Sequence, residues 1–167
     1  MLPMPERGQV IVDTTPIIAL SSVGQLDLLR ALFDRVIVPP AVHDELRAGG
    51  WGRPGFSAVE EAPWMVTVQL VDPSRAVMLS DLDRGEAEVI ALALERGANL
   101  VILDERLART HAKRLGLNLT GTLGLLVGAK RRALLHEVWP IVQQLREAGF
   151  RLGPAEIAEA LRLAGES

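Results

Sequence analysis

The sequence contains no cysteine, no tyrosine and few other aromatic residues. Among its 167 residues, aromatic side chains make up 4%, and the three histidines, His43, His111 and His136, lie far apart. The absence of cysteine excludes disulfides, thiolate catalysis and zinc sites built on cysteine, and the scattered histidines indicate no histidine-based metal site. With so few aromatic rings, we do not expect a broad surface for base stacking.

Long hydrophobic runs and an excess of positive charge are also missing. Hydrophobic residues make up 49% of the chain, yet no run approaches the roughly 20 uncharged residues of a membrane-spanning helix. The N-terminal residues lack the charged-then-apolar order of a signal peptide, so we expect a cytoplasmic protein with no membrane partner. The net charge of −3 argues against binding nucleic acid by bulk positive charge. It does not exclude a nuclease, because a metal-dependent nuclease gathers carboxylates.

Short apolar runs alternate with segments of helical periodicity. Strands are predicted at residues 9–12, 35–39, 64–71, 100–103 and 117–119. Helices are predicted at residues 16–32, with a break near Val23, and at residues 40–47, 57–62, 85–96, 106–115, 123–132, 136–148 and 154–163. This alternation predicts an α/β fold, with a central, mostly parallel sheet of about four to five strands and helices on both faces. We expect one domain, with a tail at residues 1–8, a core at residues 9–132 and C-terminal helices at residues 133–167 packed on that core.

Hydrophilic side chains end three of the predicted strands. Asp13 follows the first strand, Asp104 follows the fourth, and Thr120-Gly121-Thr122 ends the last. In a parallel sheet these carboxyl ends lie at one edge, so Asp13 and Asp104 should approach each other. Neighbouring carboxylates repel and are difficult to ionise together unless a cation is present. Oxygen ligands without cysteine or clustered histidine suit Mg²⁺ or Mn²⁺, so the sequence predicts a site for one of these ions.

Acids on two predicted helices are candidates for the same site. Glu86 lies at the start of its helix, where an acid also stabilises the helix N-terminus, and Glu88, two positions on, points elsewhere. Glu45 lies near the end of its helix, where an acid is mildly unfavourable and needs another explanation. Judged singly, each of these acids is better explained as a solvated surface residue.

Four stretches, taken in order, carry these acids. They are Ile11-Val12-Asp13-Thr14, Val42-His43-Asp44-Glu45-Leu46, Gly85-Glu86-Ala87-Glu88-Val89-Ile90-Ala91-Leu92-Ala93 and Leu100-Val101-Ile102-Leu103-Asp104. In order and spacing they resemble the motifs of PIN domains, which are small α/β ribonucleases that include toxins of bacterial toxin–antitoxin modules. Residues 109–124 look most like a prokaryotic PIN-like subfamily of largely unassigned function. The resemblance runs from about Gln9 to Arg132 and rests on the ordered set rather than on any single motif.

The resemblance implies a metal-dependent ribonuclease that acts on single-stranded RNA. It implies one acidic catalytic pocket, metal ligands for Mg²⁺ or Mn²⁺ and hydroxyl neighbours that contact the substrate: Asp13, Glu45, Glu86 and Asp104 form the pocket, Asp13, Glu86 and Asp104 hold the metal, and Thr14 and Thr122 are the neighbours. Two positions depart from the pattern of PIN toxins. Glu86 stands where many of them carry Asp, and Ile102 stands where they often carry Thr.

Basic residues of two predicted helices would hold the RNA chain. They are Arg106, Arg109, Lys113, Arg114 and the run Lys130-Arg131-Arg132. The structural alternative is that these residues form solvated helix faces without any ligand.

Two other classes of function remain open. A PIN-like scaffold with weak or no catalysis would act as a module that binds nucleic acid or a partner such as a small antitoxin protein. A phosphotransfer domain built on Asp13 is the other class, but haloacid-dehalogenase-like phosphatases need a second Asp where Thr15 stands. Because PIN domains often pair, we also expect a homodimer, with Trp51 as a candidate interface residue.

Overall fold

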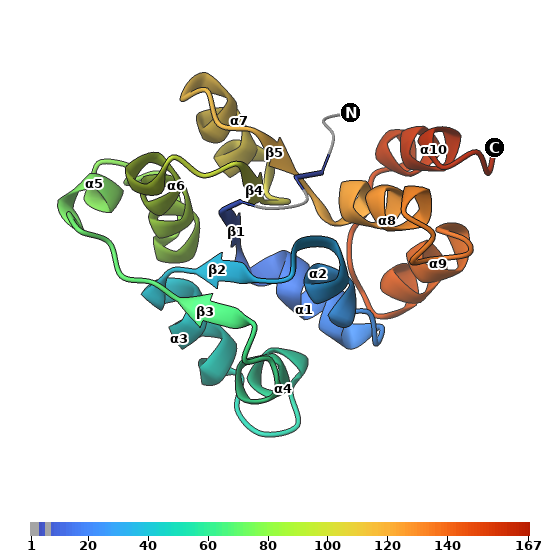
Figure 1. Ribbon diagram of the computed structural model, residues 1–167, viewed down its shortest axis with the longest axis horizontal. Coiled ribbons are helices and arrows are strands. Elements are labelled where there is room, and N and C mark those ends of the chain that lie inside the picture. Colours follow the sequence, from blue (N-terminus) through green and yellow to red (C-terminus); the bar gives the residue numbers. More distant parts are fainter. Residues whose placement is uncertain (1–3, 6–7) are drawn as a thin grey trace.

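Five short parallel strands form one sheet at the centre of the computed structural model (Figure 1). The structure describes residues 4–5 and 8–167, so residues 1–3 and 6–7 of the predicted tail lie outside the described residues. The sheet order is β3-β2-β1-β4-β5. The strands are β1 Val10–Val12, β2 Val36–Val38, β3 Met65–Thr67, β4 Leu100–Ile102 and β5 Leu119–Thr120. The predicted parallel sheet of an α/β fold is confirmed.

The strand order places the ends of β1 and β4 side by side. Ile11 of β1 is aligned with Ile37 of β2 on one side and with Val101 of β4 on the other. β2 and β3 are added on one side of β1, and β4 and β5, which come later in the chain, are added on the other side. The strand order therefore reverses between β1 and β4. Open α/β sheets bind their ligands in the crevice at this kind of reversal, outside the carboxyl ends of the strands. Asp13 and Asp104 follow these two strands.

Helices cover both faces of the sheet, as predicted. In Figure 1, α6 lies on one side of the sheet, and α1 and α2 lie on the other. The helices are α1 Thr14–Ser22, α2 Asp27–Phe33, α3 Pro40–Ala48, α4 Pro54–Glu61, α5 Ser74–Val77, α6 Arg84–Arg96, α7 Arg106–Arg114, α8 Thr122–Arg131, α9 Trp139–Glu147 and α10 Pro154–Leu163. Local signals set several bounds. Pro40 and Pro154 occupy the first turns of α3 and α10, and Gly97 ends α6 with a φ of 60° that favours glycine.

The core lies between the sheet and its helices and extends under the C-terminal helices. All residues of β1, β2 and β4 are buried, which is expected for apolar, mostly β-branched strands covered on both faces. Leu145 of α9 and Ile157 of α10 are buried as well, and α10 packs against α8. The C-terminal helices therefore rest on the same core as the sheet.

The structure differs from the sequence prediction in several segments outside the candidate site. The helix expected over residues 57–62 begins earlier, at Pro54. The strand expected over residues 64–71 ends at Thr67. Its partner β2 ends at Val38, and Pro39 has no N–H with which to continue the ladder. The polar connection after β3 contains the short helix α5, which had not been predicted.

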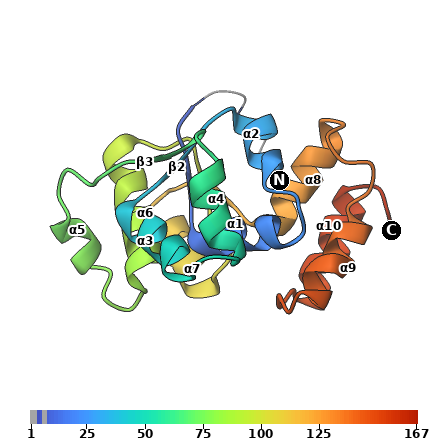
Figure 2. The same ribbon diagram turned by 90° about the horizontal axis from the view of Figure 1, so that it is seen from below.

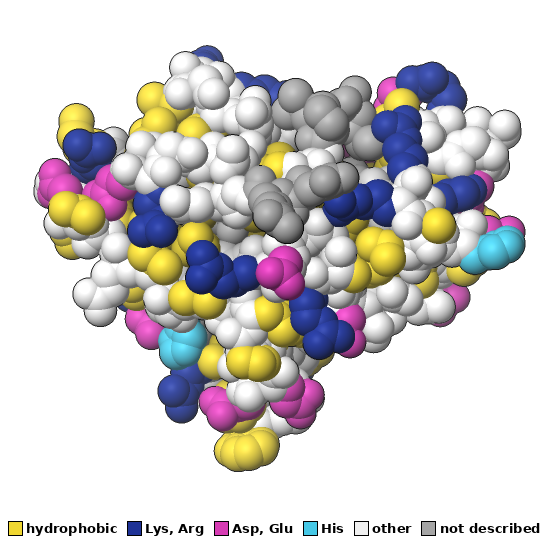
Figure 3. All heavy atoms as spheres, in the orientation of Figure 1, with side chains coloured by type: hydrophobic (Ala, Val, Ile, Leu, Met, Phe, Trp, Pro, Cys, Tyr) yellow, Lys and Arg dark blue, Asp and Glu magenta, His cyan; other side chains and the backbone are white. Residues whose placement is uncertain are grey.

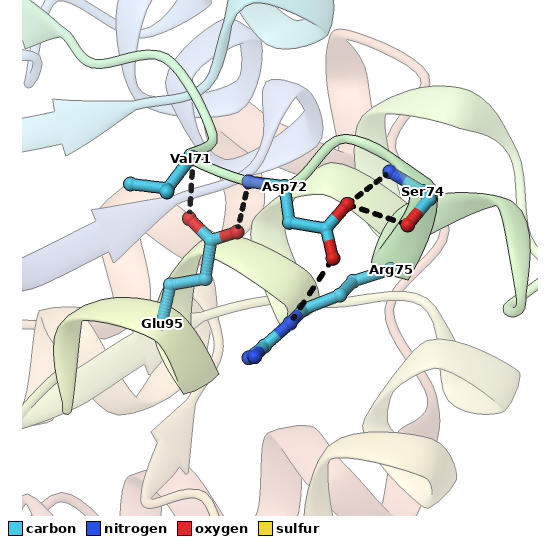
Figure 4. A network of polar contacts seen from close by, with 5 residues as sticks. All are labelled: Val71, Asp72, Ser74, Arg75 and Glu95. Carbon is cyan, nitrogen blue, oxygen red and sulfur yellow. Dashed lines mark hydrogen bonds and ion pairs between the residues drawn. The ribbon is translucent and has the colours of Figure 1, made fainter.

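Hydrogen bonds hold the α5 connection against α6 (Figure 4). The Glu95 carboxylate accepts hydrogen bonds from the backbone N–H groups of Val71 and Asp72, both at 2.8 Å. Asp72 in turn accepts from the backbone and the hydroxyl of Ser74 and lies 3.8 Å from the Arg75 guanidinium. A single acid of α6 thus fixes the start of the connection.

Large apolar side chains are exposed at two places. Trp51, in the connection between α3 and α4, is 89% exposed, and its ring lies 4.9 Å from that of Phe56 between centroids. Val71, Val77 and Met78 are exposed around α5. Figure 3 shows hydrophobic side chains over the connection between α3 and α4, at the bottom of the view, and around α5, on the left.

Within residues 4–5 and 8–167, no single helix has the length and apolar character needed to cross a membrane. The pair α1 and α2 would pass together on length and composition, but the two helices are bent by 117°.

Candidate active site

Asp13 lies directly after β1, at the N-terminus of α1, and is only 4% exposed. Its backbone N–H donates to the carbonyl of Ile102 in the neighbouring β4 at 3.0 Å, which fixes its position beside that strand. Burial raises the pKa of the Asp13 carboxyl from 3.8 to about 7. The backbone N–H of Thr14 opposes this change, and the negative charges of Glu86, Asp83 and Glu45 add to it.

Glu86 lies in the first turn of α6 and is 8% exposed. It forms a capping box with Asp83, the N-cap of that helix. The Glu86 N–H donates to the Asp83 carboxylate at 2.8 Å, and the Asp83 N–H donates to the Glu86 carboxylate at 3.2 Å. Burial, together with the charges of Asp83 and Glu105, raises the pKa of Glu86 to about 7. The capping role anticipated for Glu86 is real, and its carboxylate nevertheless stands among other acids.

Glu45 reaches the same region from the last turns of α3. Its Oε2 accepts a hydrogen bond from the Thr14 hydroxyl at 2.8 Å. Its Oε1 lies so close to the backbone of Gly85 that any side chain at that position would collide with the carboxylate. Thr14 and Gly85 therefore hold the Glu45 carboxylate in place. These contacts explain why an acid near the end of α3 is tolerated.

Asp104 follows β4 and binds the N-terminus of α8. Its two oxygens accept hydrogen bonds from the backbone N–H of Thr122 at 2.8 Å and from the Thr122 hydroxyl at 2.5 Å. Arg109 lies beside it and donates to the Leu103 carbonyl at 2.7 Å. Burial lowers the pKa of Arg109 below its ordinary value, although the charge of Asp104 opposes the effect. Like Glu45, the Asp104 carboxylate rests against a glycine, Gly121.

The electrostatic cluster around Asp13 does not contain every predicted site acid. Asp13 is affected by the charges of Glu45, Asp83 and Glu86, whereas Asp104 is not among the charges that raise the pKa of Asp13. In the described part of the chain, no three histidine or acidic side chains lie close enough together to hold a metal ion. The donors nevertheless fit a hard divalent cation in kind, because carboxylate oxygens such as those of the buried Asp13 and Glu86 are the ligands that Mg²⁺ and Mn²⁺ bind.

Two acids of the cluster were missed by the sequence interpretation. Asp83 caps α6 and influences both Asp13 and Glu86, and Glu105 caps α7 by accepting from the Ala108 N–H at 3.0 Å. The pattern Asp-x-x-Glu before an apolar helix is a capping-box signature and could have identified Asp83. No comparable signal marked Glu105.

Glu88 takes no part in the acidic cluster. Its carboxylate accepts from the Ala41 N–H at the start of α3 at 3.1 Å and pairs with Arg84 at 3.0 Å. It thus ties α3 to α6, which agrees with the expectation that it points away from Glu86.

Most of the basic residues proposed for RNA binding fall into two groups, and the exposed Arg114 belongs to neither. Arg106, Arg109 and Lys113 line a groove of about 1250 Å³ that also contains Asp104 and Thr122. The run at residues 130–132 instead binds the protein itself: Lys130 pairs with Glu166, Arg131 donates to Leu163 and Arg132 donates to Leu32. In the structure this run therefore links α8 to other parts of the chain, a role that differs both from RNA binding and from a solvated helix face.

Comparison of the sequence with known protein families identifies one matching family. The sequence profile of one family, described as PIN domain, matches residues 9–166, and thus includes α9 and α10. No curated protein sequence matches the chain. PIN domains are generally nucleases and generally use divalent metal ions. Since the match spans nearly the whole chain, this protein belongs to the PIN-domain family.

Proposed function

We propose that this protein is a cytoplasmic, metal-dependent ribonuclease that hydrolyses phosphodiester bonds of single-stranded RNA. The observation that carries the proposal is the pair of buried acids Asp13 and Glu86, each with a pKa near 7, beside the carboxyl end of β1. Burying several carboxylates together is unfavourable for the fold alone, because each disfavours the ionisation of the others. Strongly raised pKa values of this kind are typical of functional sites.

The residues take distinct roles in this proposal. Asp13, Glu86 and Asp104 would hold Mg²⁺ or Mn²⁺, and Glu45, oriented by the Thr14 hydroxyl, would complete the pocket. When bound, a divalent ion supplies a Lewis acid for the phosphate and a water of lowered pKa. Arg106, exposed at the edge of the groove, would bind the RNA phosphate next to the acids.

The finer biological assignment also belongs to the proposal. The toxin of a toxin–antitoxin pair is the role suggested by the resemblance of the motifs. The competing function is a PIN-like binding module with weak or no catalysis. One observation favours it: the carboxylates of Glu86, Glu45 and Asp104 already accept hydrogen bonds from protein groups. A metal ion has to compete with those hydrogen bonds.

Cleavage of a labelled RNA separates the two functions. Single-stranded RNA labelled at its 5′ end is incubated with the wild type, Asp13→Asn and Asp27→Asn in the presence of Mn²⁺, Mg²⁺ or EDTA. Asp27→Asn is the matched control, since this acid is 80% exposed and lies outside the site. We expect cleavage by the wild type and the control with metal only. The Asp13→Asn rate should be lower by more than about 100-fold, since even residues behind the metal ligands contribute 10–100-fold.

RNA that stays intact with both metals would overturn the nuclease proposal, as would equal rates for the wild type and Asp13→Asn. The binding module would then be the better description of the protein.

A further inference from the structure

The groove beside Asp104 has a second wall, which is formed by the connection between α9 and α10. On one side the groove is lined by α7, with Arg106 and Lys113, and on the other by residues 150–153 and α10. Figure 2 shows that α7 and the pair α9 and α10 are separated by α1 and α8. The site acid Asp104 thus lies in a groove whose far wall comes from the C-terminal part of the chain.

Unpaired positive charge faces this groove from both walls. Arg106, Lys113 and Arg151 are exposed, and within residues 4–5 and 8–167 none of their side chains makes an ion pair or a hydrogen bond. The acids of the far wall contribute less charge. Glu159 is paired with Arg162 through two hydrogen bonds, at 2.8 and 2.7 Å, whereas Glu156, whose carboxylate lies against Gly153, keeps its negative charge against the three cations. The free charge of the groove beyond Asp104 is therefore mainly positive.

The floor of the groove is apolar. Leu119 of β5, together with Leu123 and Val127 of α8, lines it, and Phe150 and Leu152 extend it onto the far wall. Phe150 is half-buried and is the aromatic residue of this surface. A strand with a phosphate backbone and flat bases needs these two features together, because cations bind the phosphates while an aromatic ring stacks on a base.

We propose that the α9–α10 connection holds the RNA strand on the side of the groove opposite α7. Arg151 binds a phosphate across from Arg106 and Lys113, and Phe150 contacts a base, while the phosphate to be cleaved lies near Asp104. This inference rests on the proposed ribonuclease function and adds to it a binding surface for the nucleotides beyond the cleaved bond. The continuity of free cations with the site acid favours a nucleic acid over a polypeptide as the occupant.

Binding is measured separately from cleavage to test this surface. A fluorescein-labelled single-stranded RNA of about 12 nucleotides, which fits the usual range of single-strand binding sites, is titrated with the Asp13→Asn protein, and its anisotropy is followed at several salt concentrations. The groove variants Lys113→Gln, Arg151→Gln and Phe150→Leu are made in that background. Arg146→Gln is the matched control, because Arg146 is exposed on α9 and does not line the groove.

We expect Lys113→Gln and Arg151→Gln to weaken binding roughly tenfold at low salt. Each should also reduce the slope of log affinity against log salt by about 0.7, the value for one lost contact to a single-strand phosphate. Phe150→Leu should weaken binding without changing the slope, since stacking involves no counterion release. Arg146→Gln should bind like the Asp13→Asn parent. Melting curves establish that each variant is folded.

Two results would overturn the inference. The first is that Lys113→Gln and Arg151→Gln have the same RNA affinity and the same salt slope as Arg146→Gln. The groove would then be better explained as a binding site for a polypeptide partner. The other is no measurable RNA binding by the parent protein. The nuclease proposal is judged separately by the cleavage assay: loss of binding in the groove variants without any cleavage by the wild type would support this surface and refute the nuclease.

Discussion

Replacing Asp13 by Asn should make the free energy of unfolding less dependent on pH and higher above pH 7. Asp13 is almost completely buried and has a pKa of about 7 in the folded protein, against 3.8 as its ordinary value. Between these two values the folded state keeps a proton that the unfolded chain has lost. The free energy of unfolding therefore falls as pH rises, because the unfolded state binds fewer protons.

The size of the effect follows from the same two pKa values. One pKa unit corresponds to about 1.36 kcal/mol, so ionising the carboxyl in place costs roughly 4 kcal/mol once the pH exceeds 7. The contribution of the protonated Asp13 carboxyl to the free energy of unfolding is fully present below pH 3.8 and is lost by about pH 7. Asn carries no charge at any pH, and its presence also lowers the cost of ionising Glu86. The free energy of unfolding of Asp13→Asn, relative to that of the wild type, should therefore rise by a few kcal/mol from pH 4 to pH 8.

Urea unfolding of the wild type, Asp13→Asn and Asp27→Asn at several pH values measures this gain. Parallel curves of free energy against pH for the wild type and Asp13→Asn would refute the reasoning, and Asp27→Asn should show no comparable divergence. Adding Mn²⁺ at pH 8 provides a second measurement. A ligand that binds only the folded state at 100 times its Kd stabilises it by about 2.7 kcal/mol, and only proteins with Asp13 intact should respond fully.

Three further predictions concern other parts of the molecule. Gly85→Ala should displace the Glu45 carboxylate and lower kcat while RNA affinity stays unchanged, so an unaltered kcat would show that the position of Glu45 is unimportant. Ala133, which has a φ of 60°, should become less strained as Gly; the free energy of unfolding of Ala133→Gly should rise by about 1 kcal/mol, and a decrease in urea unfolding would contradict this. If the expected homodimer uses Trp51, light scattering of Trp51→Ala should give a smaller mass than the wild type, whereas equal masses would exclude this residue from the interface.

The sequence predicted the elements that carry the acids because local signals define them. β1 and β4 are buried apolar runs that end in acids, and Gly97 stops α6 where expected. The sequence could not provide the strand order, in which β4 pairs directly with β1. That pairing depends on contacts between distant segments, and it is what brings Asp13 close to the end of β4.

Tertiary contacts also explain what the prediction missed. α5 has four residues, too few for a periodic pattern, and its connection is fixed by Glu95 of a different helix. The groove wall at Phe150 and Arg151 had no motif at all, since it becomes visible only when the α9–α10 connection is placed opposite α7. Composition leaves few rings for base stacking, but it could not indicate where such a ring lies.

The folded state can hold so many acids at one edge because helix N-termini meet there. Asp13, Asp83 and Glu105 are the N-cap residues of α1, α6 and α7, and Asp104 caps α8 through Thr122. Each N-terminus offers N–H groups and a partial positive charge, which offsets part of the repulsion between carboxylates. The same contacts weaken the binding of a metal ion, because a carboxylate oxygen that accepts hydrogen bonds from a helix N-terminus has fewer free lone pairs for the ion. Metal affinity in this protein should accordingly be set by capping residues such as Asp83 as much as by the ligands themselves.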